Sequence, residues 1–200
     1  MYNDRRFESS SHDIILYLSK YMDISEELEK ILTENLLVRE YKKGTVLLKK
    51  GDLCKECYFI LKGLIRTYYI EDEREITTDF HMEEQVVSPS CYGTDIPSEL
   101  FLECLEYTVA CIGSPEMENK MYKNYPQLET LSRVMGEKIM SGYRDTLDSF
   151  KMLTPEQRYL KIVKTNPDLI QRVPLYQIAS YLGIKPESLS RIRNRITRKS

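Results

Sequence analysis

The sequence predicts an α+β protein in which a β-rich N-terminal part precedes a helical C-terminal part. Residues 37–112 hold short runs rich in β-branched, leucine and aromatic side chains, separated by turn dipeptides. Residues 126–200 instead repeat apolar side chains at intervals of three and four, which is the spacing of amphipathic helices. We therefore expect three parts, spanning residues 1–125, 126–150 and 151–200.

The composition is that of a water-soluble globular chain. The 200 residues are 42% hydrophobic and 30% charged, which is enough apolar material for a sizeable core. No apolar run approaches the roughly 20 residues needed to cross a bilayer. The first seven residues are polar and charged and lack the apolar stretch of a signal peptide. We expect a cytoplasmic protein that does not enter a membrane.

The net charge of −2 conceals an uneven distribution. Residues 151–200 contain 11 Lys and Arg against three Asp and Glu, a net charge of +8. Residues 1–150 carry 18 basic and 28 acidic side chains, a net charge of −10. A basic C-terminal quarter on an acidic body indicates a local surface for a polyanion, although a solvated basic tail is the simpler alternative.

The cysteines indicate neither a disulfide framework nor a complete metal site. There are five of them, Cys54, Cys57, Cys91, Cys104 and Cys111. An odd number without a signal peptide argues against structural disulfides. Cys54 and Cys57 form a C-x-x-C, which suits half a zinc site or a redox pair, but no second such pair follows. We interpret both as ordinary thiols of a loop or strand and expect no metal and no other cofactor.

Two helices are predicted before the β-rich region. Ser25 precedes Glu26 and Glu27, which is the pattern of an N-cap followed by first-turn acids. The apolar residues after it, from Leu28 to Leu36, recur at helical spacing. A shorter apolar patch, Ile14–Leu18, predicts another helix before this one.

The β-rich region predicts an antiparallel sandwich or barrel. Its expected strands are Thr45–Leu48, Tyr58–Leu61, Leu64–Ile70, Ile76–His81 and Tyr107–Ile112. Its expected turns are Lys43-Gly44, Gly51-Asp52, Lys62-Gly63 and Glu71-Asp72. Several short strands at close spacing are typical of these two architectures.

A long helix is predicted from Pro126 to Phe150. Proline suits the first turn of a helix, and apolar side chains then follow at intervals of three and four. This stripe can lie wholly against the β-rich domain. Because the small residues Gly136 and Gly142 lie in or near it, the helix can also pack against its own copy, and we expect both contacts. A further helix is expected to start at Thr154 and to end before Asn166-Pro167.

The segment Val173–Arg198 predicts a helix-turn-helix. Its first helix places Ile178 and Leu182 inward, and Ala179 is small where a second helix must approach closely. Gly183 can adopt the left-handed conformation that ends a helix and turns the chain. Small residue, glycine and two amphipathic helices at this spacing together favour the motif, although each alone is weak.

The second helix of this motif is expected to begin at Pro186. Ile184 can fill the gap between the helices, and Leu189, Ile192 and Ile196 form the buried stripe. The candidate DNA contacts on the outer face are Lys185, Glu187, Ser188, Arg191, Asn194 and Arg195.

These side chains suit different parts of a DNA duplex. Arg191 can bond a guanine edge in bidentate fashion, and Glu187 can accept from a cytosine amino group. Ser188 and Asn194 can contact bases or phosphates. The cations best placed for phosphates are Lys185, Arg193, Arg195, Arg198 and Lys199. An ordinary solvated face is the alternative; DNA contact is favoured because the turn and the positive charge coincide in one segment.

The order of these features resembles the Crp/Fnr family of bacterial transcription regulators, those similar to the cyclic-AMP receptor protein. The resemblance covers nearly the whole chain and rests on Lys43-Gly44, Lys50-Gly51-Asp52, Tyr58–Gly63, the long helix and Gly183–Arg191. In the family's recognition-helix signature, the positions matching Glu187 and Arg191 read bases. The resemblance implies a jelly-roll-like, double-stranded β-helix as sensor domain, a long dimerisation helix, and DNA binding as a homodimer.

Three departures from the family pattern bear on the effector and on affinity. Cyclic-nucleotide binders carry an arginine near the phosphate, whereas Ser90–Leu105 has no Arg or Lys and contains Asp95, Glu99 and Glu103. We therefore expect that cyclic AMP is not the ligand and that the effector is apolar or cationic, or absent. Only residues 197–200 follow Ile196, so the family's β wing is not expected. The family's iron–sulfur sensors use cysteines near the N-terminus, and here the first is Cys54.

The leading hypothesis is a homodimeric transcription regulator with an unidentified small-molecule effector or none. Its two recognition helices would meet successive major grooves about 34 Å apart. The alternative is a ligand-binding module whose C-terminal unit binds a protein partner instead of DNA. We expect no enzyme, because no phosphate-binding glycine loop, metal-ligand cluster or nucleophile motif is present.

Overall fold

A computed structural model describes residues 13–198, in two compact units. The N-terminal unit comprises residues up to Arg66 together with Phe80–Lys138, and the C-terminal unit comprises Thr67–Asp79 together with the chain from Ile139 onward. The polar start of the chain and Lys199 lie outside the described residues. The division predicted at residues 125 and 150 remains a prediction.

Two predicted helices precede the strands. Residues 13–18 are helical, as expected. Helix α2 (Glu26–Asn35) is capped by Ser25, whose side chain accepts a hydrogen bond from the Leu28 amide at 3.2 Å. Both predictions are thus confirmed. A further helix, α3 (Pro115–Asn124), begins after the cap residue Ser114 and was not anticipated.

Eight strands form two four-stranded sheets in the described part of the chain. They are β1 (Leu37–Tyr41), β2 (Val46–Leu48), β3 (Cys57–Lys62), β4 (Ile65–Glu71), β5 (Arg74–His81), β6 (Val86–Val87), β7 (Phe101–Cys104) and β8 (Thr108–Gly113). The orders are β1-β8-β3-β6 and β2-β7-β4-β5, and the registered pairs are antiparallel. The predicted antiparallel architecture is confirmed. All five predicted strands are present, whereas β1, β6 and β7 were missed.

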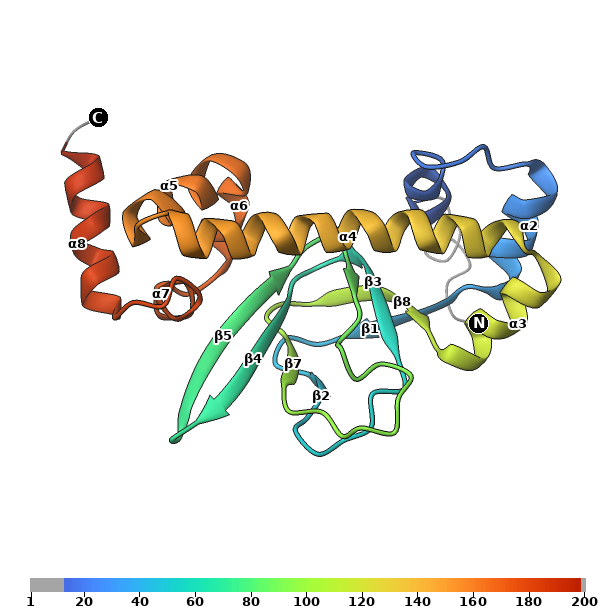
Figure 1. Ribbon diagram of the computed structural model, residues 1–200, viewed down its shortest axis with the longest axis horizontal. Coiled ribbons are helices and arrows are strands. Elements are labelled where there is room, and N and C mark those ends of the chain that lie inside the picture. Colours follow the sequence, from blue (N-terminus) through green and yellow to red (C-terminus); the bar gives the residue numbers. More distant parts are fainter. Residues whose placement is uncertain (1–12, 199–200) are drawn as a thin grey trace. The chain divides into compact units, whose positions relative to one another are not determined.

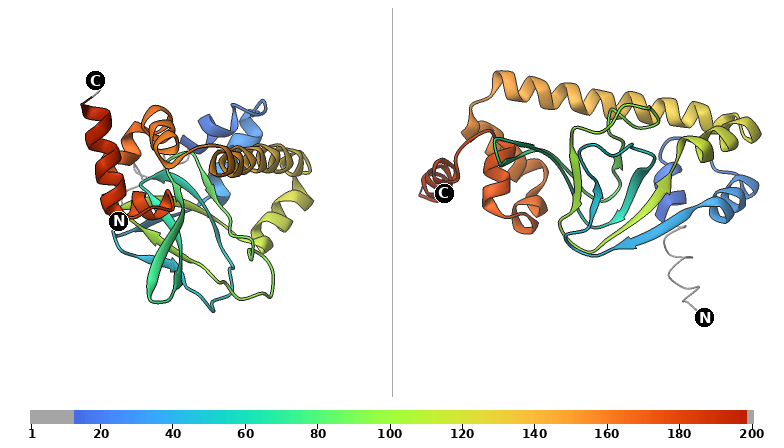
Figure 2. Two further views of the ribbon diagram at one scale, coloured as in Figure 1. Left: turned by 60° about the vertical axis from the view of Figure 1, so that its left-hand side comes forward. Right: turned by 90° about the horizontal axis from the view of Figure 1, so that it is seen from below.

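The interior of the N-terminal unit is filled from both sheets. Ile60 from β3, Ile65 from β4, Leu102 from β7 and Ala110 from β8 have no exposed surface and belong to one cluster. Alternate residues of a strand face the same side, so this cluster collects the inward-facing set of each sheet. The curvature of the strands around this interior can be followed in Figure 2.

Helix α4 (Gln127–Met152) is 26 residues long and begins in the N-terminal unit (Figure 1). Its first turns bury Leu128 and Leu131 against Leu28 and Leu32 of α2, which forms a second core cluster. The predicted long helix is confirmed, and its start at Pro126 is shifted by one residue. None of the helices in the described range could span a membrane.

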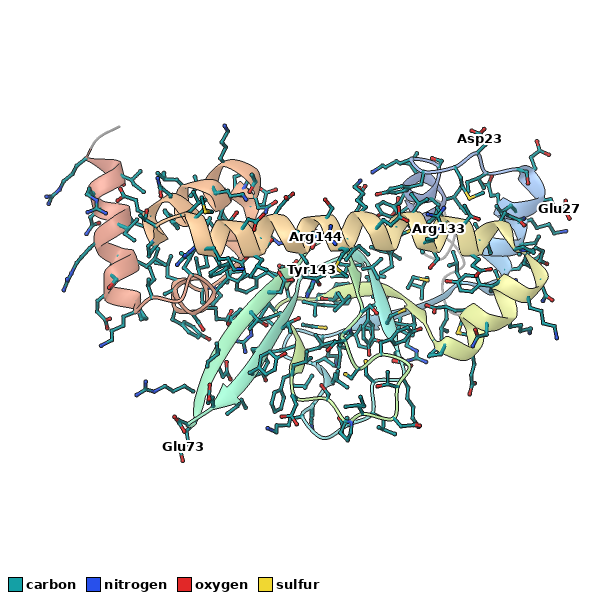
Figure 3. The ribbon with its side chains drawn as sticks, viewed as in Figure 1. Asp23, Glu27, Glu73, Arg133, Tyr143 and Arg144 are labelled. Atoms are coloured by element: carbon teal, nitrogen blue, oxygen red, sulfur yellow. The ribbon has the colours of Figure 1, made fainter. Side chains whose placement is uncertain are left out.

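The rest of the C-terminal unit consists of short helices and a hairpin. The helices are α5 (Pro155–Thr165), α6 (Pro167–Arg172), α7 (Leu175–Tyr181) and α8 (Pro186–Thr197). Thr154 and Gln157 cap α5 reciprocally, as a capping box does. The hairpin is the distal part of β4 and β5, and Glu73 lies at its tip (Figure 3). Asp72 and Glu73 have φ of 49° and 62°, which fits the predicted turn.

Candidate nucleic-acid interface

Helices α7 and α8 form the predicted helix-turn-helix (Figure 1). Gly183 has φ of 70°, and its amide donates to the carbonyl of Ser180 at 2.9 Å. The Ile184 amide donates to the carbonyl of Ala179 at 3.0 Å. These bonds satisfy the last carbonyls of α7 and reverse the chain, as a left-handed glycine at a helix end does. The role predicted for Gly183 is confirmed.

The two helices share a dry core. Ile178, Ala179, Leu182 and Leu189 have no exposed surface, and Ile192 is buried. Removing such side chains from water stabilises the unit by about 1.5–3 kcal/mol for each large one. The inward orientation predicted for α7 is therefore confirmed, as it is for Leu189 and Ile192 of α8, whereas Ile196 is only half-buried. The opposite face of α8 is left toward solvent.

The candidate DNA contacts lie on that outward face. Lys185, Glu187, Arg191 and Asn194 are exposed, and Ser188 is half-buried. Within the described residues, Arg191 forms no ion pair, so its guanidinium is available to an external acceptor. Pro186 occupies the first turn of α8 and lacks the amide hydrogen that this position would leave unpaired.

Arg195 is held differently from the other candidates. Its guanidinium forms an ion pair with Glu156 at the start of α5. This ion pair links α8 to α5. Arg195 must release the Glu156 carboxylate before it can pair with a phosphate. No local pattern predicts this pairing, because 39 residues separate the partners.

Ser180 joins α7 to the hairpin of the same unit. Its hydroxyl accepts from the Thr77 amide at 2.9 Å and donates to the Glu75 carbonyl at 3.2 Å. One side chain thus bonds two backbone groups of strand β5. Ser180 was not among the predicted site residues, since nothing local distinguishes it from other serines of a helix.

Arg158 is the second residue that sequence reasoning missed. Its guanidinium donates to the carbonyls of Phe150 and Leu153 at 3.1 Å each and to that of Leu182 at 2.8 Å. It also lies over the Phe150 ring at 4.6 Å from the centroid. The side chain therefore links the end of α4, the start of α5 and the turn after α7.

The stretch of the N-terminal unit that a cyclic phosphate would approach holds paired carboxylates. Glu103 bonds the buried Arg66 at 2.7 Å, and Glu99 bonds Lys50 at 2.7 Å. Arg66 comes from β4, outside the segment Ser90–Leu105 in which the sequence shows no cation. Its positive charge is already matched by Glu103.

The cysteines are all free thiols, and four of the five are buried. Burial raises the pKa of Cys57 from 9.0 to about 11 and that of Cys111 to about 12. Such thiols are protonated at neutral pH, which does not suit a nucleophile. In the described part of the chain, no three His, Cys, Asp or Glu side chains gather as a metal site.

Comparison with known proteins bears on both units. Residues 38–120 match the model of the cyclic nucleotide-binding domain. The fumarate nitrate reduction regulatory protein of Klebsiella oxytoca is 27% identical over 185 residues, covering 84% of this chain and 72% of the relative. The chain is therefore similar to transcriptional regulators of the Crp/Fnr type.

Solved structures share the family's fold. A transcriptional regulator of the Crp/Fnr family from Eubacterium rectale superposes with a TM-score of 0.67 at 20% identity, over 92% of this chain and 88% of its own. A CooA mutant from Carboxydothermus hydrogenoformans gives 0.67 at 15% identity, over 88% and 82%. At these identities the likeness concerns the fold, and it confirms the predicted β-roll followed by a helix-turn-helix.

Proposed function

We propose that this chain is a transcription regulator of the Crp/Fnr type, which binds a palindromic DNA site as a homodimer and inserts α8 into the major groove. The observation that supports this most directly is the outward face of α8, where Lys185 and Arg191 stand opposite a fully buried Leu189. A rigid core behind an exposed basic face is what a recognition helix needs. Because the target is DNA, we place the protein in the cytoplasm.

The residues of that face divide into base and phosphate contacts. We assign Arg191 to a guanine edge and Glu187 to a cytosine amino group. Ser188 and Asn194 complete the contact with bases or phosphates, and Lys185 and Arg195 neutralise phosphates. Since Arg195 already has Glu156 as partner, we expect it to contribute less affinity than Lys185.

A homodimer is supported by the exposed seam of α4. Gly136, Met140, Tyr143 and Leu147 follow one another at intervals of four, three and four, the spacing of a coiled-coil seam. Met140, Tyr143 and Leu147 are 56%, 46% and 53% exposed in the single chain. An added Cβ at Gly136 would meet no atom within 4 Å, so a partner helix can approach there. Figure 3 shows Tyr143 on the middle of this helix.

We propose further that cyclic AMP is not the effector. A cyclic phosphate near Ser90–Leu105 would find no cation in that stretch and would compete with Glu103 for Arg66 and with Glu99 for Lys50. Displacing a carboxylate from a buried guanidinium leaves that carboxylate without its partner, which is costly. An apolar or cationic effector avoids this competition.

DNA binding is tested by selecting fragments from genomic DNA and titrating the best with the full chain at several salt concentrations. Affinity should fall steeply with salt. Arg191→Ala should weaken binding to the selected site by about 1–3 kcal/mol and relax the sequence preference at one base pair. Arg144→Ala, an exposed arginine of α4, is the matched control and should bind normally.

Other outcomes would refute the assignment. Failure to bind any DNA fragment, together with salt-insensitive binding of a specific protein partner, would favour the protein-binding alternative. Equal losses for Arg191→Ala and Arg144→Ala would show that only general charge matters.

The homodimer is tested separately by sedimentation velocity. Leu147→Glu places a charge on the seam and should give monomers. Ser141→Glu adds the same charge at an exposed position off the seam and should leave the dimer intact. A monomeric unmodified chain would refute the proposal.

A further inference from the structure

A pocket of about 120 Å³ lies wholly within the C-terminal unit, away from the face of α8 assigned to DNA. Its walls come from the last turns of α4, from α5 and from the end of α7. Helix α4 contributes Thr146, Ser149 and Phe150 to the lining, α5 contributes Lys161, and α7 contributes Tyr181. Asn166, the residue after α5, also lines the pocket. The DNA-binding role does not use this pocket.

The lining is positively charged. Arg158 and Lys161 both contribute to it, and no carboxylate is among the lining residues. Lys161 donates to the hydroxyl of Ser149, a neutral partner that leaves two of its N–H groups unused. Arg158 donates only to backbone carbonyls. Within residues 13–198 neither cation has an ion-pair partner.

Two polar groups at the pocket are open to a further partner. The Nε of Arg158 is buried without a hydrogen-bond partner. Asn166 precedes α6 as its N-cap residue, yet its side chain makes no capping bond. A buried donor without a partner costs free energy. An anionic acceptor that reaches the Nε of Arg158 would remove this cost when it binds.

Apolar side chains supply the other walls. Phe150 and Tyr181 meet edge to face with their centroids 5.9 Å apart, and Ile162 and Leu182 are buried beside them. The pocket's volume of about 120 Å³ is smaller than the roughly 150 Å³ of a closed cavity that holds a benzene ring, so a flat ring would be enclosed only in part. A pocket of this size, with cations on one side and rings on the other, fits a small anion that carries a flat apolar part.

We propose that this pocket binds a small organic carboxylate, with Arg158, Lys161 and Asn166 at the carboxylate and Phe150 and Tyr181 at the apolar part. Tyr181 leads directly into the turn that sets α8. An occupant would therefore hold α7 against the end of α4 and alter the affinity for DNA. The site is separate from the β-roll, in which the family-type effector would bind.

The test compares benzoate with its neutral isostere benzamide, added to the full chain at constant ionic strength. Benzoate should raise the melting temperature and shift the amide resonances of Thr146 and Tyr181, and benzamide should do neither to the same degree. Lys161→Gln should weaken benzoate binding roughly tenfold, the loss expected for one charge-assisted bond. Lys164→Gln removes an exposed lysine of α5 outside the pocket and should bind benzoate normally.

Three results would overturn the proposal. They are equal responses to benzoate and benzamide, equal losses in the two lysine variants, and resonance shifts that avoid Thr146 and Tyr181. Asn166→Leu provides a second variant if Lys161→Gln folds poorly. No DNA is present in this assay. A negative result with benzoate therefore does not bear on the DNA-binding role, and a failure to bind DNA does not change how the benzoate result is interpreted.

Discussion

Replacement of Ser180 by alanine should loosen the hairpin from α7. The substitution removes the acceptor for the Thr77 amide and the donor to the Glu75 carbonyl. Thr77 is only 3% exposed, so its amide hydrogen loses its partner without gaining water. Leaving a buried donor unsatisfied costs about 1–3 kcal/mol. We expect a loss of about 2 kcal/mol in the local stability of this contact.

Hydrogen exchange at the Thr77 amide measures this loss directly. A change of about 1–3 kcal/mol corresponds to exchange that is roughly 5- to 150-fold faster. The control is Ser190→Ala at an exposed serine, whose hydroxyl bonds the Pro186 carbonyl within α8. That variant should leave exchange at Thr77 unchanged.

Comparable exchange at Thr77 in the two variants would refute the reasoning, because it would show that the amide is protected by strand pairing alone. Faster exchange throughout the C-terminal unit would also count against it, since the expected effect is confined to the hairpin and α7. The DNA affinity of Ser180→Ala reports whether this contact also helps to position α8.

Three further predictions concern stability. Gly63→Ala should unfold the N-terminal unit, because an added Cβ would lie 2.5 Å from Thr108 Oγ1. Gly44→Ala creates similar backbone strain but leaves the new Cβ in open space. It should lower the free energy of unfolding, measured by chemical denaturation, by only about 1–2 kcal/mol. Leu189→Ala should destabilise the C-terminal unit by about 2–5 kcal/mol and abolish DNA binding while the β-roll stays folded by circular dichroism. The raised pKa of Cys111 predicts that the free energy of unfolding is highest below pH 9 and falls as pH approaches 12, since the unfolded thiol ionises first; Cys111→Ala should flatten this decline.

The sequence predicted those elements whose signals are local. Ser25 and Thr154 are followed by residues that complete their caps, and Gly183 lies where only a left-handed residue ends the helix readily. The two helices of the helix-turn-helix followed from the spacing of Ile178, Leu182 and Leu189. Caps, turns and amphipathic stripes are determined by neighbours within about a turn, so single-sequence reasoning reaches them.

The missed strands lacked that local signal. Strand β1 has Arg39 and Glu40 at its centre, and β6 is two residues long. Both owe their place to pairing, β1 with β8 and β6 with β3. Strand β7 lies inside the stretch that was read only for its charges. Pairing between distant segments depends on the whole sheet, which no window of the sequence contains.

The candidate site was also only half visible in the sequence. The outward face of α8 follows from helical spacing, so Arg191 and its neighbours could be named. The ion pair of Arg195 with Glu156 and the carbonyl contacts of Arg158 join residues 39 and up to 24 positions apart. Charge alone marks such residues as cations but does not say whether they serve the fold or a ligand.

Two elements run from the N-terminal unit into the C-terminal unit, and each is connected there to the helices that precede α8. Strand β4 begins at Ile65 in the first unit and continues into the hairpin, where β5 bonds Ser180 of α7. Helix α4 starts in the first unit and ends at Met152, where Arg158 fixes the Phe150 and Leu153 carbonyls. A strand and a helix are stiff over such lengths, whereas the contacts at their ends are a few hydrogen bonds. An effector in either unit can therefore alter DNA binding by changing these end contacts. To do so, it must bind one arrangement of the contacts more tightly than another. Variants at Ser180 and at Arg158 separate the two routes, since each cuts one connection and leaves the other in place.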